Sequence, residues 1–180
     1  MQKTILALAG EMGSGKGAIA EYLIEKHGAK KFRFSSVFRD ILDRLHIEES
    51  RENIQALSTT LRSAFGDDIL SQTIVGDIGQ SDAPLIIIDG VRREEDMRYL
   101  KHLEGFTFVF IDADMDTRYT RIVSRGENAS DTTKTLAQFL KESEAESEAR
   151  IRGLRDIADQ VIENNGTMEE LYEKVEKMLG

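Results

Sequence analysis

A glycine-rich turn between an apolar segment and a helical segment places the strongest constraint on this chain. Residues 10–16, with the sequence GEMGSGK, fit the pattern G-x-x-x-x-G-K. They follow the apolar segment 4–9 and precede residues 18–26, in which apolar residues recur at helical spacing. Glycines allow successive backbone N–H groups to point inward, and the following helix N-terminus adds partial positive charge. The turn is therefore predicted to bind phosphate groups, with the ammonium of Lys16 beside the terminal phosphates.

The order of the predicted elements indicates an α/β fold. Residues 4–9, 32–35, 85–88, 107–111 and 160–163 have the composition of strands, and helical patterns separate them. The continuously apolar segment 85–88 is typical of a central parallel strand that is buried on both faces. Thr167 and Glu170 form a capping-box pattern that predicts a last helix. We expect a three-layer fold with a five-stranded parallel sheet, and ligands at the carboxyl ends of its strands.

Length and composition indicate one folded domain over residues 1–180. A chain of 180 residues corresponds to about one domain, and 40% hydrophobic residues with a single Pro exclude disordered and low-complexity classes. The segment from about 36 to 80 is mainly helical, with Val37, Ile41 and Leu45 predicted on one helical face. The segment from about 124 to 150 is polar and acidic, and it is predicted to be a small, exposed, mobile insertion.

Charge and residue usage exclude several classes of function. The formal net charge of -9 disfavours duplex nucleic acid as a partner, and any phosphate site must concentrate its Lys and Arg locally. The chain has no Cys, which excludes disulfides and thiolate metal sites, and its three His form no metal-ligand pattern. No apolar run approaches the roughly 20 residues of a membrane span, and the N-terminus lacks a secretory pattern. We expect a cytoplasmic protein without a membrane segment.

Charged residues follow the predicted second and third strands. Arg39 lies in the first turn of the helix after the second strand, where the alternative is a surface arginine that pairs with a neighbouring carboxylate. Asp89 and Arg93 follow the third strand, and Arg92 competes with Arg93 for the same role. Asp89 is a candidate to hold a magnesium ion through water, with Asp112 as a rival and loop capping as the alternative. These cations and carboxylates suit phosphoryl transfer, which depends on positioning and on charge stabilisation.

Three further arginines recur along one helix. Arg118, Arg121 and Arg125 are spaced i, i+3 and i+7, which places them on one stripe beside the apolar face. The polar segment 124–150 begins at the end of this stripe. A cleft edge is the functional interpretation, and a solvated helix surface is the alternative.

Taken in order, these segments resemble the small P-loop kinases, which include adenylate kinase, other nucleoside monophosphate kinases and dephospho-coenzyme A kinase. Residues 15–17 resemble the adenylate kinase loop, and residues 35–39 resemble the segment that presents an arginine to the acceptor phosphate. Residues 89–93 resemble the D-G-x-P-R segment, with Arg92 where proline stands in those kinases. Residues 158–171 resemble the last strand and helix of dephospho-coenzyme A kinase.

The resemblance implies a role for each candidate residue. It implies ATP with Mg²⁺ as cofactors and a lid over residues 124–150. The backbone of the glycine turn would hold the ATP phosphates, and Lys16 would bridge them. Arg39 and Arg93 would hold the acceptor, whereas Arg121 and Arg125 would stabilise the transferred group. Asp89 would position magnesium-bound water or the nucleophile. The implied nucleotide-binding residues are Gly10, Glu11, Met12, Gly13, Ser14, Gly15, Lys16, Gly17 and Ala18.

The expected activity is transfer of the γ-phosphoryl group of ATP to a small phosphorylated acceptor, first a nucleoside or deoxynucleoside monophosphate and second dephospho-coenzyme A. Two departures favour a regulatory nucleotide-binding module as the alternative. Gly17 and Ala18 lack the hydroxyl that normally binds magnesium after the lysine, and the lid-like segment is acidic where the resembling families carry arginines. The base of the donor, the identity of the acceptor and the oligomeric state stay open at this point.

Overall fold

The structure is a computed structural model that describes residues 3–125, 134–144 and 146–180. Its strands and helices alternate along the chain, as expected for an α/β fold. The strands are β1 (Thr4–Ala9), β2 (Lys30–Arg33), β3 (Leu85–Asp89), β4 (Phe106–Asp112) and β5 (Gln160–Glu163). The α-helices are α1 (Lys16–His27), α2 (Phe34–Arg44), α3 (Arg51–Phe65), α4 (Ile69–Gly79), α5 (Met115–Arg125), α6 (Leu136–Ser143), α7 (Glu146–Gly153) and α8 (Met168–Leu179). The short 3-10 helices are η1 (Glu94–Met97), η2 (Leu100–His102) and η3 (Leu154–Ile157).

The strands form one five-stranded sheet in the order β2-β3-β1-β4-β5. Every neighbouring pair is parallel, so the predicted five-stranded parallel sheet is confirmed. In the register, Asp89 at the end of β3 is level with Leu8 of β1 and with Arg33 of β2. The carboxyl ends of the strands, and the loops that follow them, therefore meet at one edge of the sheet.

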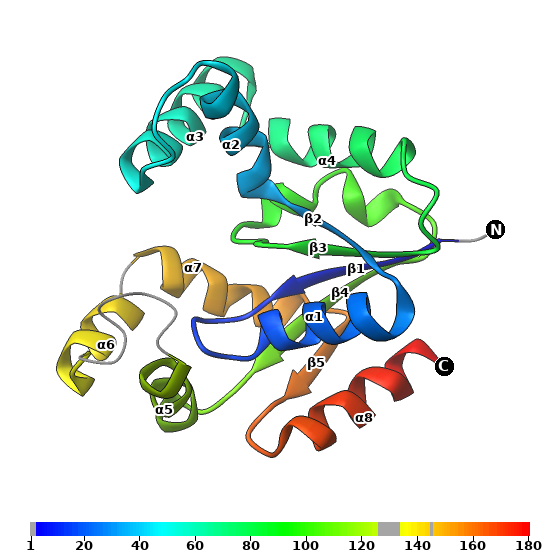
Figure 1. The fold of residues 1–180 in the computed structure, drawn as a ribbon, viewed down its shortest axis with the longest axis vertical. Coiled ribbons are helices and arrows are strands. Elements are labelled where there is room, and N and C mark those ends of the chain that lie inside the picture. Colours follow the sequence, from blue (N-terminus) through cyan, green and yellow to red (C-terminus); the bar gives the residue numbers. More distant parts are fainter. Residues whose placement is uncertain (1–2, 126–133, 145) are drawn as a thin grey trace.

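Alternating residues of the strands build a separate core on each face of the sheet. Ile5, Ala7 and Ala9 of β1 face the core formed with α2, α4, α7 and η3, whereas Leu6 and Leu8 face the core formed with α1 and α8. Figure 1 shows α1 and α8 below the sheet and α4 above it. Five of the six β1 residues are buried, as expected for the central strand of a sheet that is covered on both faces.

The region after α1 differs from the sequence prediction. A strand over 32–35 and a helix with a face of Val37, Ile41 and Leu45 were expected, but β2 covers Lys30–Arg33 and α2 begins at Phe34. The buried face of α2 is Phe34, Phe38 and Leu42, and Leu45 is 56% exposed. The prediction was wrong because Phe32 and Phe34 alternate like strand residues, whereas Phe34 belongs to the i, i+4, i+8 series that α2 packs on the sheet.

The helical region predicted from about 36 to 80 consists of α2, α3 and α4. Helix α3 buries none of its residues fully, whereas α4 buries Leu70, Ile74 and Ile78 against the sheet. In Figure 1, α2 and α3 form an arm that projects beyond the sheet. None of the helices described in residues 3–125, 134–144 and 146–180 combines the length and apolar character needed to span a bilayer.

The lid-like segment predicted from about 124 to 150 is described in part. Residues 126–133 and 145 lie outside the described residues, and α6 and α7 belong to the described part. Phe139 of α6 is fully buried and packs against the ring of Tyr119 of α5, with ring centroids 5.6 Å apart. Helix α6 is thus anchored to α5 by an apolar contact rather than solvated on every side.

The predicted capping box at Thr167 is confirmed, and α8 packs on α1. The Thr167 hydroxyl accepts a hydrogen bond from the Glu170 backbone N–H, and the Glu170 carboxylate accepts one from the Thr167 N–H. The rings of Tyr22 in α1 and Tyr172 in α8 stack at 4.0 Å. Beside them the Glu176 carboxylate accepts a hydrogen bond from the Tyr22 hydroxyl at 2.6 Å and lies 2.7 Å from His27 Nε2. These contacts tie the C-terminal helix to the first.

The Glu176 contacts make the stability of the α1–α8 pair depend on pH. Hydrogen bonds from Tyr22, His27 and Lys26 lower the pKa of Glu176 from 4.5 to about 2. Because the pKa in the folded state is the lower one, the stabilisation is present above pH 4.5 and disappears as the pH falls toward 2. We expect Glu176→Gln to lower the urea midpoint at pH 7 and to have no effect at about pH 2. Glu173→Gln, at an exposed position of the same helix, is the control, and equal effects of both variants at pH 7 would contradict the assignment.

Candidate functional site

The glycine turn lies between β1 and α1 at the carboxyl edge of the sheet, and two of its glycines are required by close contacts. Gly10, Gly13 and Gly15 all have positive φ. A Cβ atom at Gly10 would lie 2.3 Å from the carbonyl oxygen of Ile111, and one at Gly13 would lie 2.7 Å from that of Arg118. The turn therefore passes so close to β4 and α5 that no side chain fits. The pattern found in the sequence is thus a geometric requirement of this fold.

Polar atoms inside the turn suit an anion. The Lys16 ammonium donates hydrogen bonds to the carbonyl oxygens of Gly10 at 2.6 Å and Glu11 at 3.1 Å. The Ser14 hydroxyl is buried, in a residue that is only 1% exposed, and it finds no hydrogen-bond partner among the described residues. A buried hydroxyl without a partner is unusual and is expected where a ligand completes the hydrogen bonds. These residues fit the phosphate groups of a nucleotide.

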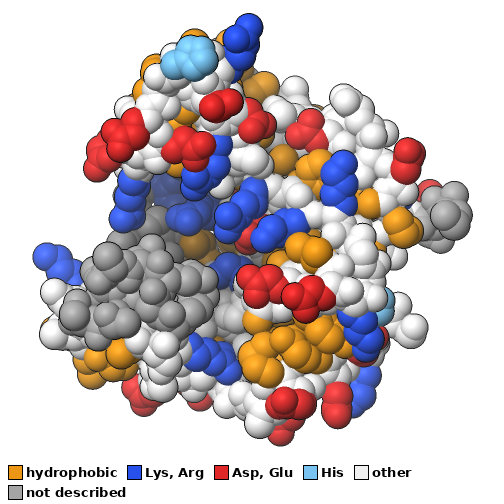
Figure 2. Space-filling model, in the orientation of Figure 1, with side chains coloured by type: hydrophobic (Ala, Val, Ile, Leu, Met, Phe, Trp, Pro, Cys, Tyr) orange, Lys and Arg blue, Asp and Glu red, His pale blue; other side chains and the backbone are white. Residues whose placement is uncertain are grey.

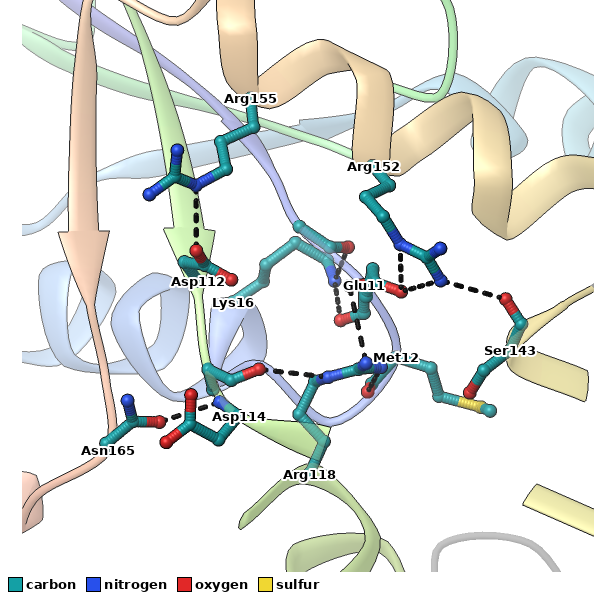
Figure 3. Close-up of polar contacts among 12 residues, drawn as sticks. Glu11, Met12, Lys16, Asp112, Asp114, Arg118, Ser143, Arg152, Arg155 and Asn165 are labelled. Carbon is teal, nitrogen blue, oxygen red and sulfur yellow. Dashed lines mark hydrogen bonds and ion pairs between the residues drawn. The ribbon is translucent and has the colours of Figure 1, made fainter. Parts of the chain in front are cut away.

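Glu11, inside the turn, is held between two arginines from the helices on either side of the lid-like segment. Its carboxylate lies 3.3 Å from Arg118 Nη2 and 3.0 Å from Arg152 Nη2 (Figure 3). The Glu11 and Arg118 side chains are 8% and 5% exposed, whereas that of Arg152 is 56% exposed. Arg118 also donates to the carbonyl oxygens of Ala113 and Met12. Glu11 therefore ties the glycine turn to both α5 and α7.

Arg121 and Arg125 follow Arg118 along α5, but only one of them has a described side chain. Arg121 donates to the backbone carbonyl of Asn164 at 2.8 Å, to its side-chain oxygen at 3.3 Å and to the carbonyl of Gly166 at 3.3 Å. Burial lowers the pKa of Arg121. The Arg125 side chain lies outside the described residues. The sequence predicted that Arg121 contacts the transferred group. The structure places its guanidinium on the β5–α8 loop, where three oxygens hold it, and the predicted contact with the transferred group stays a prediction.

A shallow hollow opens beside Arg121. It has a volume of about 360 Å³ and lies between α5 and the β5–α8 loop. The Asn165 side-chain oxygen, on the rim of this hollow, accepts a hydrogen bond from the backbone N–H of Asp114 at 2.7 Å. The lining residues are Asp116, Thr117, Thr120, Arg121, Asn165 and Gly166. Asn164 connects this hollow to the glycine turn, since it contacts both Arg121 and that turn.

On the other side of the turn, the surface is hollowed and basic. Figure 2 shows Lys and Arg side chains gathered between the α2–α3 arm and the lower part of the molecule. The ends of β1 and β3 point toward this hollow, and α2 borders it (Figure 1). The net charge is -9, so this concentration of cations is local, as a phosphate site in an acidic chain requires.

The predicted acceptor-side arginines lie on α2 and on the loop that follows β3. Arg39 pairs with Glu49 rather than with a carboxylate of its own helix. Arg93 Nη1 lies 4.0 Å from the Asp67 carboxylate, and the Arg93 side chain is 37% exposed. The Arg92 side chain is exposed and makes no hydrogen bond or ion pair with the described residues. Both arginines follow β3 on one loop.

Asp96 fixes that loop, and nothing in the sequence pattern indicated it. Its carboxylate accepts hydrogen bonds from the backbone N–H groups of Arg92 at 3.1 Å and Arg93 at 3.2 Å. Arg62 of α3 donates to the same carboxylate at 2.8 Å, and both side chains are buried, at 9% and 2% exposure. The pair links the α2–α3 arm to the loop that carries the acceptor-side arginines. The contact between Arg62 and Asp96 joins two distant segments, and no spacing pattern in the sequence predicts a contact of this kind.

The strand-end carboxylates are engaged by arginines. Arg33 Nε donates to Asp89 at 3.0 Å, and Arg155 Nε donates to Asp112 at 2.8 Å. Among the described residues, no group of three or more His, Cys, Asp or Glu side chains could hold a metal ion. This donor set fits Mg²⁺ that is held mainly by the phosphates of a nucleotide and by water, with at most one carboxylate.

Comparison with known proteins agrees with this geometry. The sequence matches the profile of the AAA domain family over residues 6–152. The chain belongs to this family. AAA domain proteins of this kind are P-loop NTPases. Solved kinase structures share the fold, which is therefore a kinase-like P-loop fold.

Curated relatives of this AAA domain protein include uncharacterised archaeal proteins. A UPF0200 protein of Sulfurisphaera tokodaii is 29% identical over 177 residues, covering 97% of this chain and 95% of the relative. A UPF0200 protein of Hyperthermus butylicus is 24% identical, covering 98% and 94%.

Solved structures with the same fold include kinases. TT1252 from Thermus thermophilus has a TM-score of 0.61 at 17% identity, covering 99% of this chain and 97% of that one. Shikimate kinase from Aquifex aeolicus has a TM-score of 0.54 at 16% identity, covering 98% and 96%, and a sugar kinase from Janibacter has 0.56 at 16%, covering 98% and 94%. At these identities the likeness concerns the fold alone.

The buried Glu11–Arg118 contact predicts a large effect on stability. Glu11→Ala removes the carboxylate from a buried guanidinium, and we expect the free energy of unfolding to fall by about 2–4 kcal/mol. Arg155→Ala breaks an exposed pair with Asp112 and serves as the control, with an expected loss of about 0.5 kcal/mol or less. Urea unfolding of the two variants measures both losses. Equal losses would show that Glu11 contributes no more than a surface charge.

Proposed function

We propose that this protein is a kinase that transfers the γ-phosphoryl group of ATP to a small phosphorylated acceptor, with a nucleoside monophosphate as the first candidate. The observation that carries the proposal is the meeting of two features at one sheet edge: a glycine turn that suits phosphate groups, and a basic hollow beside it. A donor phosphate chain and an acceptor phosphate each need cations, and a site for two such anions explains why cations gather here in an acidic chain.

In the proposed reaction, each part of the edge has one task. The backbone N–H groups of the glycine turn and the Lys16 ammonium hold the donor phosphates, and the Ser14 hydroxyl gains a partner. Arg39 and Arg93 hold the acceptor phosphate, so that its attacking oxygen lies in line with the γ-phosphorus. The bond from that phosphorus to the β-phosphate oxygen breaks, the bond to the acceptor oxygen forms, and ADP leaves.

Arg152 is assigned the task first predicted for Arg121. Its guanidinium lies at the glycine turn with Glu11, and its side chain is 56% exposed and accessible to a ligand. Arg121 lies on the β5–α8 loop, at the hollow that we assign to the base of the donor. Arg125 and the lid role of residues 124–150 remain part of the proposal. Closure of a lid would exclude water from the transferred group.

Mg²⁺ would reach this site bound to the donor phosphates, and it would neutralise their charge. Asp89 is the carboxylate we assign to it, through a water molecule. Because Gly17 and Ala18 carry no hydroxyl, the glycine turn itself supplies no side-chain ligand at these positions.

Those missing hydroxyls favour one alternative, a nucleotide-binding module that turns over slowly or not at all. Dephospho-coenzyme A is the second acceptor to consider. Shikimate and sugars are further acceptors to test, because a shikimate kinase and a sugar kinase share the fold.

The first test is ADP release from ATP and Mg²⁺ with a panel of nucleoside monophosphates, dephospho-coenzyme A, shikimate and simple sugars, each against a control without acceptor. We expect at least one phosphorylated acceptor to stimulate turnover, and Lys16→Ala to lower that rate by about 100-fold or more. Lys177→Ala, at an exposed position of α8, is the matched control and keeps the rate. ATP binding with background rates for every acceptor would favour the regulatory module instead.

The acceptor-side assignment makes a separate prediction about the two neighbouring arginines. Loss of a charge-assisted hydrogen bond to the acceptor phosphate should raise the KM for the acceptor by about tenfold or more in Arg93→Ala, with the KM for ATP unchanged. Arg92→Ala, one position away on the same loop, should change the acceptor KM much less. Steady-state kinetics with each substrate varied in turn would measure this, and the reverse order would assign the acceptor to Arg92.

A further inference from the structure

Asn164, directly after β5, is a buried amide that joins three separate parts of the molecule. The residue is only 2% exposed. Its side-chain Nδ2 donates a hydrogen bond to the carbonyl oxygen of Ser14 at 2.8 Å, inside the glycine turn. Its backbone N–H donates to the carbonyl of Asp112, at the end of β4, at 2.7 Å. Its carbonyl and its Oδ1 accept hydrogen bonds from Arg121 of α5. Every polar atom of Asn164 is therefore used.

The amide of Asn164 lies so close to Gly15 that no side chain would fit at this position of the turn. A Cβ atom at Gly15 would lie 2.3 Å from Asn164 Nδ2. Gly15 also has a φ of 107°, which L side chains rarely adopt. The last glycine of the G-x-x-x-x-G-K pattern thus serves two needs at once, since it turns the backbone and leaves room for the amide of Asn164. The position of the turn and the position of this amide depend on each other.

The other end of the Asn164 amide leads to the hollow beside α5. Arg121, which donates to Asn164 Oδ1, also donates to Gly166, and both Arg121 and Gly166 line that hollow. A chain of hydrogen bonds therefore runs from the hollow through Arg121 and Asn164 to Ser14.

We propose that Asn164 is a positioning residue, which holds the glycine turn in its phosphate-binding shape and couples that shape to the Arg121 side of the site. This inference rests on the proposed function only in that the turn binds a polyphosphate. Asn164 touches no phosphate itself, because its donor group is used by the Ser14 carbonyl. It acts by fixing where the backbone N–H groups of the turn point.

The test compares two substitutions of an amide by a carboxylate, by calorimetric titration with inorganic tripolyphosphate, which has no base. Asn164→Asp turns the donor toward Ser14 into an acceptor, so the hydrogen bond is lost and two oxygens face each other. We expect the affinity for tripolyphosphate to fall by about tenfold or more, and the affinity for ATP to fall by the same factor. Gln160→Glu is the matched control, because it also replaces an amide by a carboxylate, at an exposed position at the start of β5, outside the proposed site. It should leave the affinity for tripolyphosphate within about twofold of the unsubstituted protein.

A purely structural role of Asn164 would give a different result. Titrations are run well below the melting temperature of each variant, so that every variant is folded. A substitution that only weakens packing lowers the melting temperature but leaves the affinity of the folded protein unchanged. Unchanged tripolyphosphate affinity in Asn164→Asp would overturn the inference. Should this variant not fold, as judged by circular dichroism, Asn164→Ser removes the same hydrogen bonds without adding charge and is read in the same way.

Failure of the proposed function has its own signature in this experiment. In that case the unsubstituted protein binds neither tripolyphosphate nor ATP, and the inference falls with the proposed function. When the unsubstituted protein binds both and the Asn164→Asp and Gln160→Glu variants behave alike, nucleotide binding stands and only the role of Asn164 is contradicted.

Discussion

The tight passage of the glycine turn between β4, α5 and the β5–α8 loop is the constraint on which the site depends. Strand β1 is buried on both faces in the centre of the sheet, so its exit is enclosed by neighbouring elements. The carbonyl of Ile111 and the amide of Asn164 each lie where a Cβ atom of the turn would otherwise stand. The turn can take this path only as glycine, and its N–H groups are consequently fixed before any ligand arrives. Phosphate binding is thus prepared by packing against segments more than 90 residues away in the chain.

The parts of the fold that the sequence predicted are those that local rules decide. The continuous apolar run at Leu85 predicted the central strand β3, the capping box at Thr167 predicted the start of α8, and the glycine pattern predicted the turn. The start of α2 was missed because Phe34 fits both a strand alternation and a helical face over a few residues. The sheet offers the helix a large apolar surface to cover, and this tertiary contact decides between the two.

For the arginines of α5, the sequence predicted a shared face but not the contacts that each one makes. The spacing of Arg118, Arg121 and Arg125 placed them on one stripe, yet the structure gives the first two different surroundings. Arg118 is buried against Glu11 of the turn, whereas Arg121 contacts Asn164 and Gly166 of the last loop. A helical period states which residues share a face, but it carries no information about which distant loop lies over each turn of that helix. The contacts of Asn164, and the contact of Asp96 with Arg62, escaped prediction for the same reason, since these partners are far apart in sequence.

Carboxylates between the arginines explain how an acidic chain maintains a basic edge. Asp89 accepts from Arg33, Glu11 from Arg152, and Asp112 from Arg155. Arginines brought together without such partners would repel one another, and each exposed pair costs little to break. The arrangement holds the guanidinium groups in fixed positions while leaving them open to exchange a carboxylate for a phosphate. Under the proposed function, an incoming phosphate group competes with Glu11 for Arg152, so the same carboxylate that orients this arginine also limits how tightly the phosphate is bound.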